Sequence, residues 1–305
     1  MRYSQVVGPR RSELIEGPEL RPGPGEVVLR VRASGVCASE YHGWASHDGG
    51  EPVRFGHELA GTITEVGTDA RGWRVGDDVT GLGGPGFADS AVMRADALLP
   101  VAAGTAFEHS LGEPLACLME AFSRTPISPQ DVVAVVGTGF MGLGFLQLAR
   151  LAGPAELIAV DYDEHHRETA LSLGATAAYH PDELPERYRA GVGVAVEAAG
   201  TASALTLAGD LVAPHGTLCI VGYHSQGSRA LDLKWWYKAV SVVHGYTPQR
   251  FRVMKAMADG LALVAEHRFT YAPLVTHLIE LSQVDTALGY FTDRPAGFIK
   301  SVVVP

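Results

Sequence analysis

Hydrophobic and polar residues alternate along the first hundred positions in the way that half-buried β-strands require. In the stretch 26–35 one face is apolar and the other polar, with Val27, Leu29, Val31 and Ala33 set against Arg30, Arg32 and Ser34. A second short strand is predicted at 62–66, and the turn at 74–79 leads into another. Short strands separated by glycine-rich turns favour a compact β-barrel or sandwich.

From about residue 130 the pattern changes to continuous apolar runs that are separated by helical segments. Such runs are typical of parallel strands buried on both faces. The first helix is expected to end at Gly153-Pro154, because glycine tolerates a left-handed cap and proline cannot continue the helix. Strands and helices in regular alternation predict a doubly wound parallel sheet. The predicted strands are 132–137, 157–161, 192–200 and 216–223, and a second helix is predicted at 165–175.

Residues 132–149 carry no charge, and a stretch of this length is long enough to suggest a membrane span. Four glycines interrupt it, at positions 137, 139, 142 and 144, and Asp131 and Arg150 bracket it. A strand, a turn and a helix explain these glycines better than a membrane helix does.

Composition narrows the class of protein. The 305 residues include 24 Lys and Arg against 34 Asp and Glu, so the formal charge is −10, which opposes broad contact with nucleic acid. The first residues lack the apolar core of a signal peptide. The cysteines, Cys37, Cys117 and Cys219, are too far apart for a CxxC motif or a disulfide framework. We therefore expect a soluble cytoplasmic protein that handles a small molecule.

A glycine-rich turn joins the first apolar strand to its helix. Residues 137–142 read Gly-Thr-Gly-Phe-Met-Gly, a GxGxxG pattern in the context of a dinucleotide site. The first glycine permits the tight turn, the second lets the backbone approach a pyrophosphate, and the third allows close packing of helix on strand. The helix N-terminus then offers free N–H groups to the phosphates. The predicted cofactor residues in this turn are Gly137, Gly139, Phe140, Met141 and Gly142.

Asp161 ends the next strand, 24 residues beyond Gly137, near the spacing of a ribose-binding acid. A carboxylate there accepts from a free 2′-hydroxyl and repels a 2′-phosphate, so NAD is favoured over NADP. The alternative is that Asp161 only caps the following helix. A cation from His165, His166 or Arg167 reaching a 2′-phosphate would soften the preference.

Metal-ligating residue types recur in the first part of the chain. They occur in Cys37-Ala-Ser-Glu-Tyr-His42, in Gly56-His57-Glu58-Leu-Ala-Gly61 and in Gly112-Glu113-Pro-Leu-Ala-Cys117. Thiolate, imidazole and carboxylate all bind Zn²⁺, and a catalytic site needs about three of them plus an open position. Each alone has an ordinary structural interpretation, a buried thiol or histidine or a surface carboxylate. Their occurrence together, upstream of a nucleotide fold, favours a metal site.

These motifs, in this order, resemble the zinc-dependent medium-chain alcohol and polyol dehydrogenases over essentially the whole chain. The resemblance implies a GroES-like β-barrel catalytic domain, residues 1–122 and 270–305, split around a Rossmann domain at 123–269. It implies that Cys37 and His57 are metal ligands, with Glu58 and Glu113 alternating between ligand and close neighbour. Glu113 stands where alcohol dehydrogenases place a second cysteine, which is similar to the sorbitol and threonine dehydrogenase branch.

The resemblance also implies a reaction. Zn²⁺ lowers the pKa of an alcohol so that hydride can pass to the nicotinamide of NAD. Ser39 is expected to hydrogen-bond the reacting oxygen, and His42 to pass the proton towards solvent. The structural alternatives are a turn hydroxyl for Ser39 and a surface imidazole for His42. The predicted catalytic residues are Ser39, His42 and Glu58.

Several positions depart from the family pattern. Relatives usually carry Asp where Glu40 stands, orienting the zinc-bound imidazole. Residues 80–90 carry no cysteine, so the four-cysteine structural zinc lobe is absent and one zinc per chain is expected. His166 replaces an arginine that contacts the adenosine in many relatives, and Lys300 matches a basic position that reaches the pyrophosphate in some.

The leading interpretation is a zinc- and NAD-dependent dehydrogenase of a secondary alcohol in a polyol, sugar, cyclitol or amino alcohol. One alternative is a zinc-independent quinone or enoyl reductase of the same fold, and another is a non-catalytic NAD-binding redox sensor. The apolar segment at 241–246 reads as an edge strand, and in this family such strands pair across a two-fold axis. A homodimer or homotetramer is therefore expected, with no nucleic-acid or membrane partner.

Overall fold

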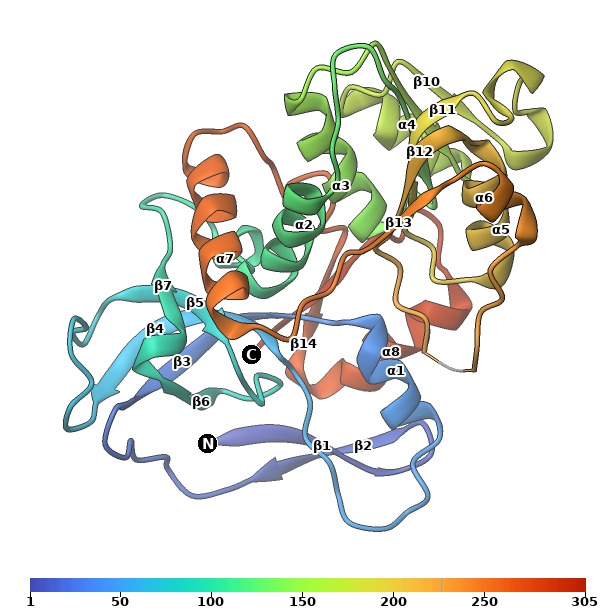
Figure 1. Ribbon diagram of the computed structural model, residues 1–305. Helices are drawn as coiled ribbons and strands as arrows, with labels where there is room; N and C mark the ends of the chain where they lie inside the picture. The colour runs from blue at the N-terminus through green and yellow to red at the C-terminus, as the bar shows by residue number, and fades with distance from the viewer. Residues whose placement is uncertain (226) are drawn as a thin grey trace. The chain divides into compact units, whose positions relative to one another are not determined.

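The computed structural model describes residues 1–225 and 227–305, and the chain divides into two units (Figure 1). Unit 1 comprises Met1–Leu115 and Met257–Pro305, and unit 2 comprises Ala116–Ala256. Both divisions fall inside helices, α2 (Gly112–Arg124) and α7 (Arg250–Ala265). The sequence predicted that the chain leaves the first domain at 122 and returns to it at 270, in each case somewhat later along the chain than these divisions.

Unit 1 is built on a seven-stranded sheet in the order β14-β15-β3-β4-β5-β7, with β6 also paired to β3. Its strands are β3 (Glu26–Gly35), β4 (Glu58–Val66), β5 (Asp78–Leu82), β6 (Ser90–Arg94), β7 (Leu98–Pro100), β14 (His277–Glu280) and β15 (Ser301–Val304). A separate hairpin is formed by β1 (Arg2–Gly8) and β2 (Arg11–Glu16). The alternation predicted for 26–35 is confirmed at Arg30 and Arg32, which are exposed while the apolar face is buried. It is wrong at Ser34, which was predicted on the polar face but is buried.

The last forty residues lie in unit 1. They include the helix α8 (Val284–Asp293), which buries Val284, Ala287 and Leu288 at helical spacing. This apolar face packs with Trp44 of a second helix, α1 (Ala38–Ala45). Strand β15 then runs antiparallel to β3, and Val302 lies opposite Gly35.

Unit 2 is a six-stranded parallel sheet in the order β10-β9-β8-β11-β12-β13. Its strands are β8 (Val132–Val136), β9 (Glu156–Val160), β10 (Ala177–Tyr179), β11 (Val192–Glu197), β12 (Val212–Ile220) and β13 (Ser241–His244). Its helices are α3 (Phe140–Leu151), α4 (Glu164–Ser172), α5 (Ala202–Leu211) and α6 (Leu233–Tyr237). The doubly wound parallel sheet is confirmed, and β13 is its edge strand.

Strand order creates a switch point in unit 2. From β8 the chain moves to β9 and β10 on one side, and then crosses to β11, β12 and β13 on the other. In open α/β sheets, ligands bind beyond the carboxyl ends of the strands at such a point. The turn after β8 therefore occupies the position where a ligand is expected.

The remaining regular segments are single 3₁₀ turns: Ala95–Ala97, Phe107–His109, Pro181–Glu183, Glu186–Tyr188 and Leu281–Gln283. Among the described residues, no helix combines the length and the hydropathy that crossing a membrane requires. The uncharged stretch 132–149 is instead β8, the glycine turn and most of α3.

Candidate metal centre and dinucleotide site

Strand register in unit 1 gathers the predicted metal ligands. Gly35, the last residue of β3, lies opposite Glu58, the first residue of β4. Cys37 follows two residues after Gly35, and His57 immediately precedes Glu58. One ligand atom each from Cys37, His57 and Glu58 lie within 4.8 Å of one another. The structure thus brings Cys37 together with His57 and Glu58, which follow it about twenty positions later in the sequence.

Gly56 turns the chain into this position. Its φ of +102° favours glycine, and a Cβ there would overlap the backbone nitrogen of Phe87. The Gly56 amide donates to Glu40 Oε1 at 2.7 Å. The turn is therefore anchored to the carboxylate that also holds His57.

Glu40 is buried and fixes the imidazole of His57. Its Oε1 lies 2.9 Å from His57 Nδ1, and its Oε2 accepts from the Cys37 amide at 3.1 Å. Because the carboxylate occupies Nδ1, Nε2 is the His57 nitrogen left for a metal. Glu40, one methylene longer than the usual aspartate, thus contacts both Cys37 and His57. It is positioned for the orienting role expected at position 40.

Two neighbouring ionisable groups, Cys37 and Glu40, act on the protonation of the His57 imidazole. Burial disfavours the imidazolium, but its hydrogen bonds to Cys37 and Glu40, together with the charges of those two groups, outweigh it and raise the pKa of His57 to about 11. Without a metal, the proton therefore stays on this imidazole at neutral pH. A divalent cation bound by thiolate, imidazole and carboxylate would replace that proton, so the donor set fits zinc.

Glu58 has a buried counter-ion that sequence reasoning missed. The Nζ of Lys300, next to β15, lies 2.6 Å from Glu58 Oε2, and the side chains are 6% and 2% exposed. Burial by itself lowers the pKa of Lys300, but the charges of Glu58 and Cys37 outweigh it and the pKa is raised. The structure places this lysine against Glu58, whereas the resemblance implied contact with a pyrophosphate.

The other predicted residues of unit 1 lie on helices. Ser39 and His42 are half-buried on α1, and the Ser39 hydroxyl donates to Cys37 Sγ at 3.2 Å. Glu113 is half-buried in the first turn of α2. It is not part of the group formed by Cys37, His57 and Glu58.

In unit 2 the glycine turn has the geometry that its sequence predicted. Gly137 has φ +87°, and a Cβ there would lie 2.7 Å from Ala199. Gly139 is the N-cap of α3, and a Cβ there would meet nothing within 4 Å, whereas at Gly142 it would overlap the carbonyl of Gly137. The second glycine is therefore open to a ligand and the third is closed by packing. Phe140 is buried and Met141 half-buried in the first turn of α3.

Asp161 directly follows β9 and reaches back to this turn, where its Oδ2 accepts from the Thr138 amide at 2.6 Å. Burial favours the neutral acid, but His166 and the amides of Asp163 and Thr138 outweigh it, so the pKa of Asp161 is lowered. The side chain therefore stays ionised, as ribose binding requires.

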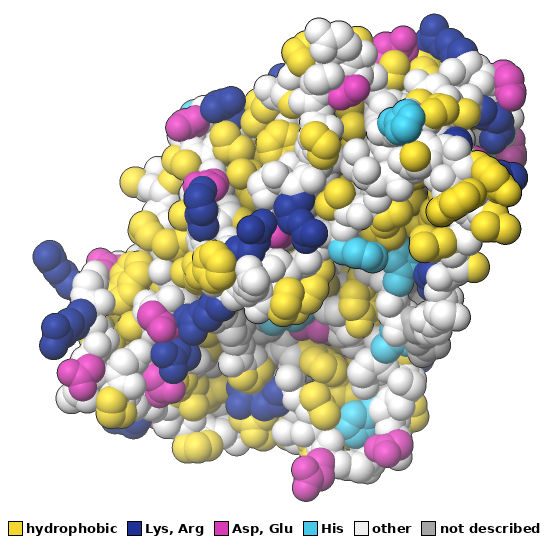
Figure 2. All heavy atoms as spheres, in the orientation of Figure 1, with side chains coloured by type: hydrophobic (Ala, Val, Ile, Leu, Met, Phe, Trp, Pro, Cys, Tyr) yellow, Lys and Arg dark blue, Asp and Glu magenta, His cyan; other side chains and the backbone are white. Residues whose placement is uncertain are grey.

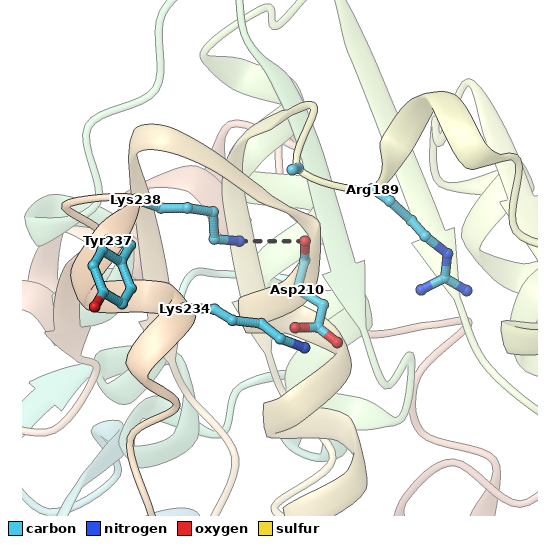
Figure 3. Close-up of a pocket in the computed structure, with 6 residues that line it drawn as sticks. Arg189, Asp210, Lys234, Tyr237 and Lys238 are labelled. Atoms are coloured by element: carbon cyan, nitrogen blue, oxygen red, sulfur yellow. Dashed lines mark hydrogen bonds between the residues drawn. The ribbon is translucent and has the colours of Figure 1, made fainter.

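One surface pocket of unit 2 has none of the predicted metal, catalytic or cofactor-binding residues in its lining. It is lined by Arg189, Ala190, Asp210, Lys234, Tyr237 and Lys238 (Figure 3). The Nζ of Lys238 donates to the carbonyls of Gly209 and Val212, both at 2.7 Å, and so satisfies the end of α5. This lysine is thereby committed to structure and is not available to a ligand.

Comparison with known proteins gives two family matches. Residues 23–103 match the alcohol dehydrogenase GroES-like domain, and residues 141–261 match the zinc-binding dehydrogenase domain. Together they confirm the predicted pairing of a GroES-like domain with a Rossmann-like domain.

Individual relatives cover nearly the whole chain. A sorbitol dehydrogenase of Halalkalibacterium halodurans is 28% identical, with 95% of this chain and 94% of that protein covered. A D-altritol 5-dehydrogenase of Agrobacterium fabrum is 26% identical, with coverage of 97% and 96%. The solved structure of a zinc-binding dehydrogenase from Sinorhizobium meliloti, bound to NADP, has a TM-score of 0.87 at 22% identity. It covers 100% of this chain and 99% of that one, which supports the fold.

Proposed function

Because the chain belongs to the zinc-dependent medium-chain alcohol and polyol dehydrogenases, we propose that it transfers hydride between NAD and a secondary alcohol or its ketone. The substrate class is a polyol, sugar, cyclitol or amino alcohol, since the relatives are named for sorbitol and D-altritol. The observation that carries the proposal is the gathering of Cys37, His57 and Glu58 around one point.

We propose one catalytic zinc per chain, held by Cys37, His57 and a carboxylate. Glu58 is the carboxylate within reach of the other two ligands, and Glu113 is the second candidate. When bound, zinc supplies a Lewis acid that lowers the pKa of an alcohol. The segment 80–90 has no cysteine for a structural zinc, which supports a single metal.

The proposed proton path begins at Ser39. Its hydroxyl donates to Cys37 Sγ at 3.2 Å, so it lies beside the ligand set where an alcohol would bind. A hydroxyl there accepts the alcohol proton and releases its own. His42, one turn further along α1, is the residue proposed to carry the proton onward.

NAD is the proposed cofactor, bound at the turn 137–142. The argument rests on Asp161, whose ionised carboxylate accepts from a ribose hydroxyl and repels a 2′-phosphate. The relative of known structure that binds NADP shares the fold at 22% identity. The test is therefore direct comparison of the two cofactors with this protein.

The proposed assembly is a homodimer or homotetramer joined along β13. This edge strand is largely exposed, and α6, which precedes it in the chain, exposes Leu233, Trp236 and Tyr237. Figure 2 shows apolar side chains gathered over α6. An unpaired edge beside an apolar patch is suited to pairing with a second copy. Light scattering is expected to show a dimer or tetramer, and Val242→Lys to weaken it.

Among the described residues no disulfide joins the three cysteines, which supports a reducing compartment, and we propose the cytoplasm.

The deciding experiment measures zinc content and NAD reduction together. We expect about one zinc per chain and NADH formation with at least one of a panel of polyols, aminocyclitols and threonine. Cys37→Ser should lose both zinc and activity, while Cys219→Ser, which alters a buried thiol in unit 2, should keep both. Activity that survives in Cys37→Ser would overturn the zinc mechanism, and bound zinc with no activity on any alcohol would favour a sensor.

A further inference from the structure

The hydroxyl of Thr138 points at the acid that follows β9. Thr138 is fully buried between the two glycines of the turn, and its Oγ1 donates to Asp161 Oδ2 at 3.1 Å. Its amide donates to the same oxygen at 2.6 Å. Any residue except proline would supply the amide bond at position 138, whereas the second bond comes from the side-chain hydroxyl.

The two oxygens of Asp161 are therefore unequal. Oδ2 receives both donors of Thr138 and lies 3.6 Å from His166 Nδ1. Among the described residues, the hydrogen bond to Oδ1 comes from the Asp163 amide, at 2.9 Å. Since a carboxylate oxygen accepts about two hydrogen bonds, Oδ1 retains the remaining acceptor position. The Asp161 side chain is 14% exposed, so this position is within reach of a ligand.

One nitrogen of the neighbouring cation, NH1 of Arg167, is hydrogen-bonded to the backbone. Arg167 NH1 donates to the carbonyl of Asp161 at 2.9 Å and to that of Tyr162 at 2.8 Å. These bonds hold the segment that carries the carboxylate. This NH1 group is thus engaged in supporting Asp161 and is not directed at an added phosphate.

We propose that Thr138 is a specificity-determining positioning residue, which fixes Asp161 so that Oδ1 receives a ribose 2′-hydroxyl and a 2′-phosphate is excluded. The inference rests on the proposed function, because it assigns the mechanism of the NAD preference. Without the hydroxyl, one fewer hydrogen bond holds Oδ2, so the Asp161 carboxylate is fixed less firmly against rotation away from a phosphate. Discrimination between the two cofactors then falls, even where the turn itself is intact.

The experiment titrates the zinc-loaded full chain with NADH and with NADPH, following the fluorescence of the nicotinamide. The measured quantity is the dissociation constant for NADPH divided by that for NADH. A merely structural defect weakens the binding of both cofactors equally and leaves this ratio unchanged. Thr138→Val, which keeps the shape and removes the hydroxyl, should reduce the ratio by about tenfold. Thr138→Ser should retain the ratio. Thr206→Val, which removes a hydroxyl bonded to the carbonyl of Ala202 on α5, is the matched control.

A second comparison protects the test against misfolding. Asp161→Asn should abolish most of the discrimination, and adding Thr138→Val to it should change the ratio no further. If the Thr138→Val protein does not fold, Thr138→Ala also removes the hydroxyl and should lower the ratio of dissociation constants in the same way. A folded Thr138→Val or Thr138→Ala protein with the wild-type ratio overturns the role of Thr138 and leaves the NAD proposal standing. Equal binding of NADH and NADPH by the wild type overturns both.

Discussion

The ammonium of Lys300 lies 2.6 Å from the carboxylate of Glu58, and both side chains are almost wholly removed from water. The pair joins β4 to the segment that enters β15, across β3. A buried carboxylate is costly unless it is paired. The ion pair therefore supplies the buried carboxylate of Glu58 with a counter-charge inside unit 1.

Replacement of Lys300 by Met should destabilise the metal-free protein by about 3–5 kcal/mol, because it leaves the charge of Glu58 buried and uncompensated. Urea unfolding measures the loss. The double variant Lys300→Met, Glu58→Gln should recover a large part of it, since the uncompensated charge is then gone. Additive losses in the double variant would show that the two residues are not coupled.

Gly35 lacks a side chain because the Glu58 carboxylate occupies that space. A Cβ at Gly35 would overlap Glu58 Oε2 and would lie 2.9 Å from Leu111 Cδ1. Gly35→Ala should cost about 1–3 kcal/mol by overpacking and should lower zinc content. In a Glu58→Ala background the same substitution should cost much less, measured by thermal unfolding. An equal cost in both backgrounds would assign the strain to other neighbours.

Glu40 should control metal affinity without binding the metal. Glu40→Gln weakens the hold on His57, so zinc affinity should fall by about 10–100-fold in a chelator competition assay. Glu40→Asp, one methylene shorter, should give an intermediate loss because it cannot keep the bonds to both Gly56 and Cys37. Glu51→Gln, an exposed acid beyond α1, is the control and should bind zinc normally. Unchanged affinity in Glu40→Gln would contradict the orienting role.

Zinc affinity should rise with pH. The pKa of His57 is raised from its ordinary value of 6.5 to about 11 in the metal-free protein, so zinc must displace a proton throughout the neutral range. Affinity should therefore increase about tenfold per pH unit between about 6 and 8 for that single proton. In the metal-free protein the same shift contributes stability that is fully present below about 6.5 and lost as pH rises through about 11. A pH-independent affinity would mean that His57 binds no proton that zinc displaces.

The local motifs were predictable because each is a short run of sequence with its own geometry. The turn 137–142 and Asp161 lie on adjacent parallel strands, β8 and β9, so strand order alone brings them together. Cys37 and His57 were predicted from residue type and from family resemblance. Their convergence depends on the register of β3 against β4, which no motif in the sequence specifies.

The missed features depend on contacts between distant segments. Lys300 and Glu58 meet only because β15 pairs with β3, and nothing near position 300 points to a carboxylate at 58. The helix α8 was not predicted either, although its buried residues Val284, Ala287 and Leu288 follow helical spacing.

The interleaved chain has a consequence for synthesis on the ribosome. Strand β3 is made early, but its partner β15 follows all of unit 2. Until then β3 lacks one neighbour, and an unpaired strand edge is a template for association with other chains. Glu58 likewise has no counter-ion until Lys300 is made, more than two hundred codons later. Until β15 is made, the nascent chain therefore has a sheet that lacks one strand and a carboxylate that lacks its counter-ion. The chain is more prone to aggregate during this period than after the sheet is complete.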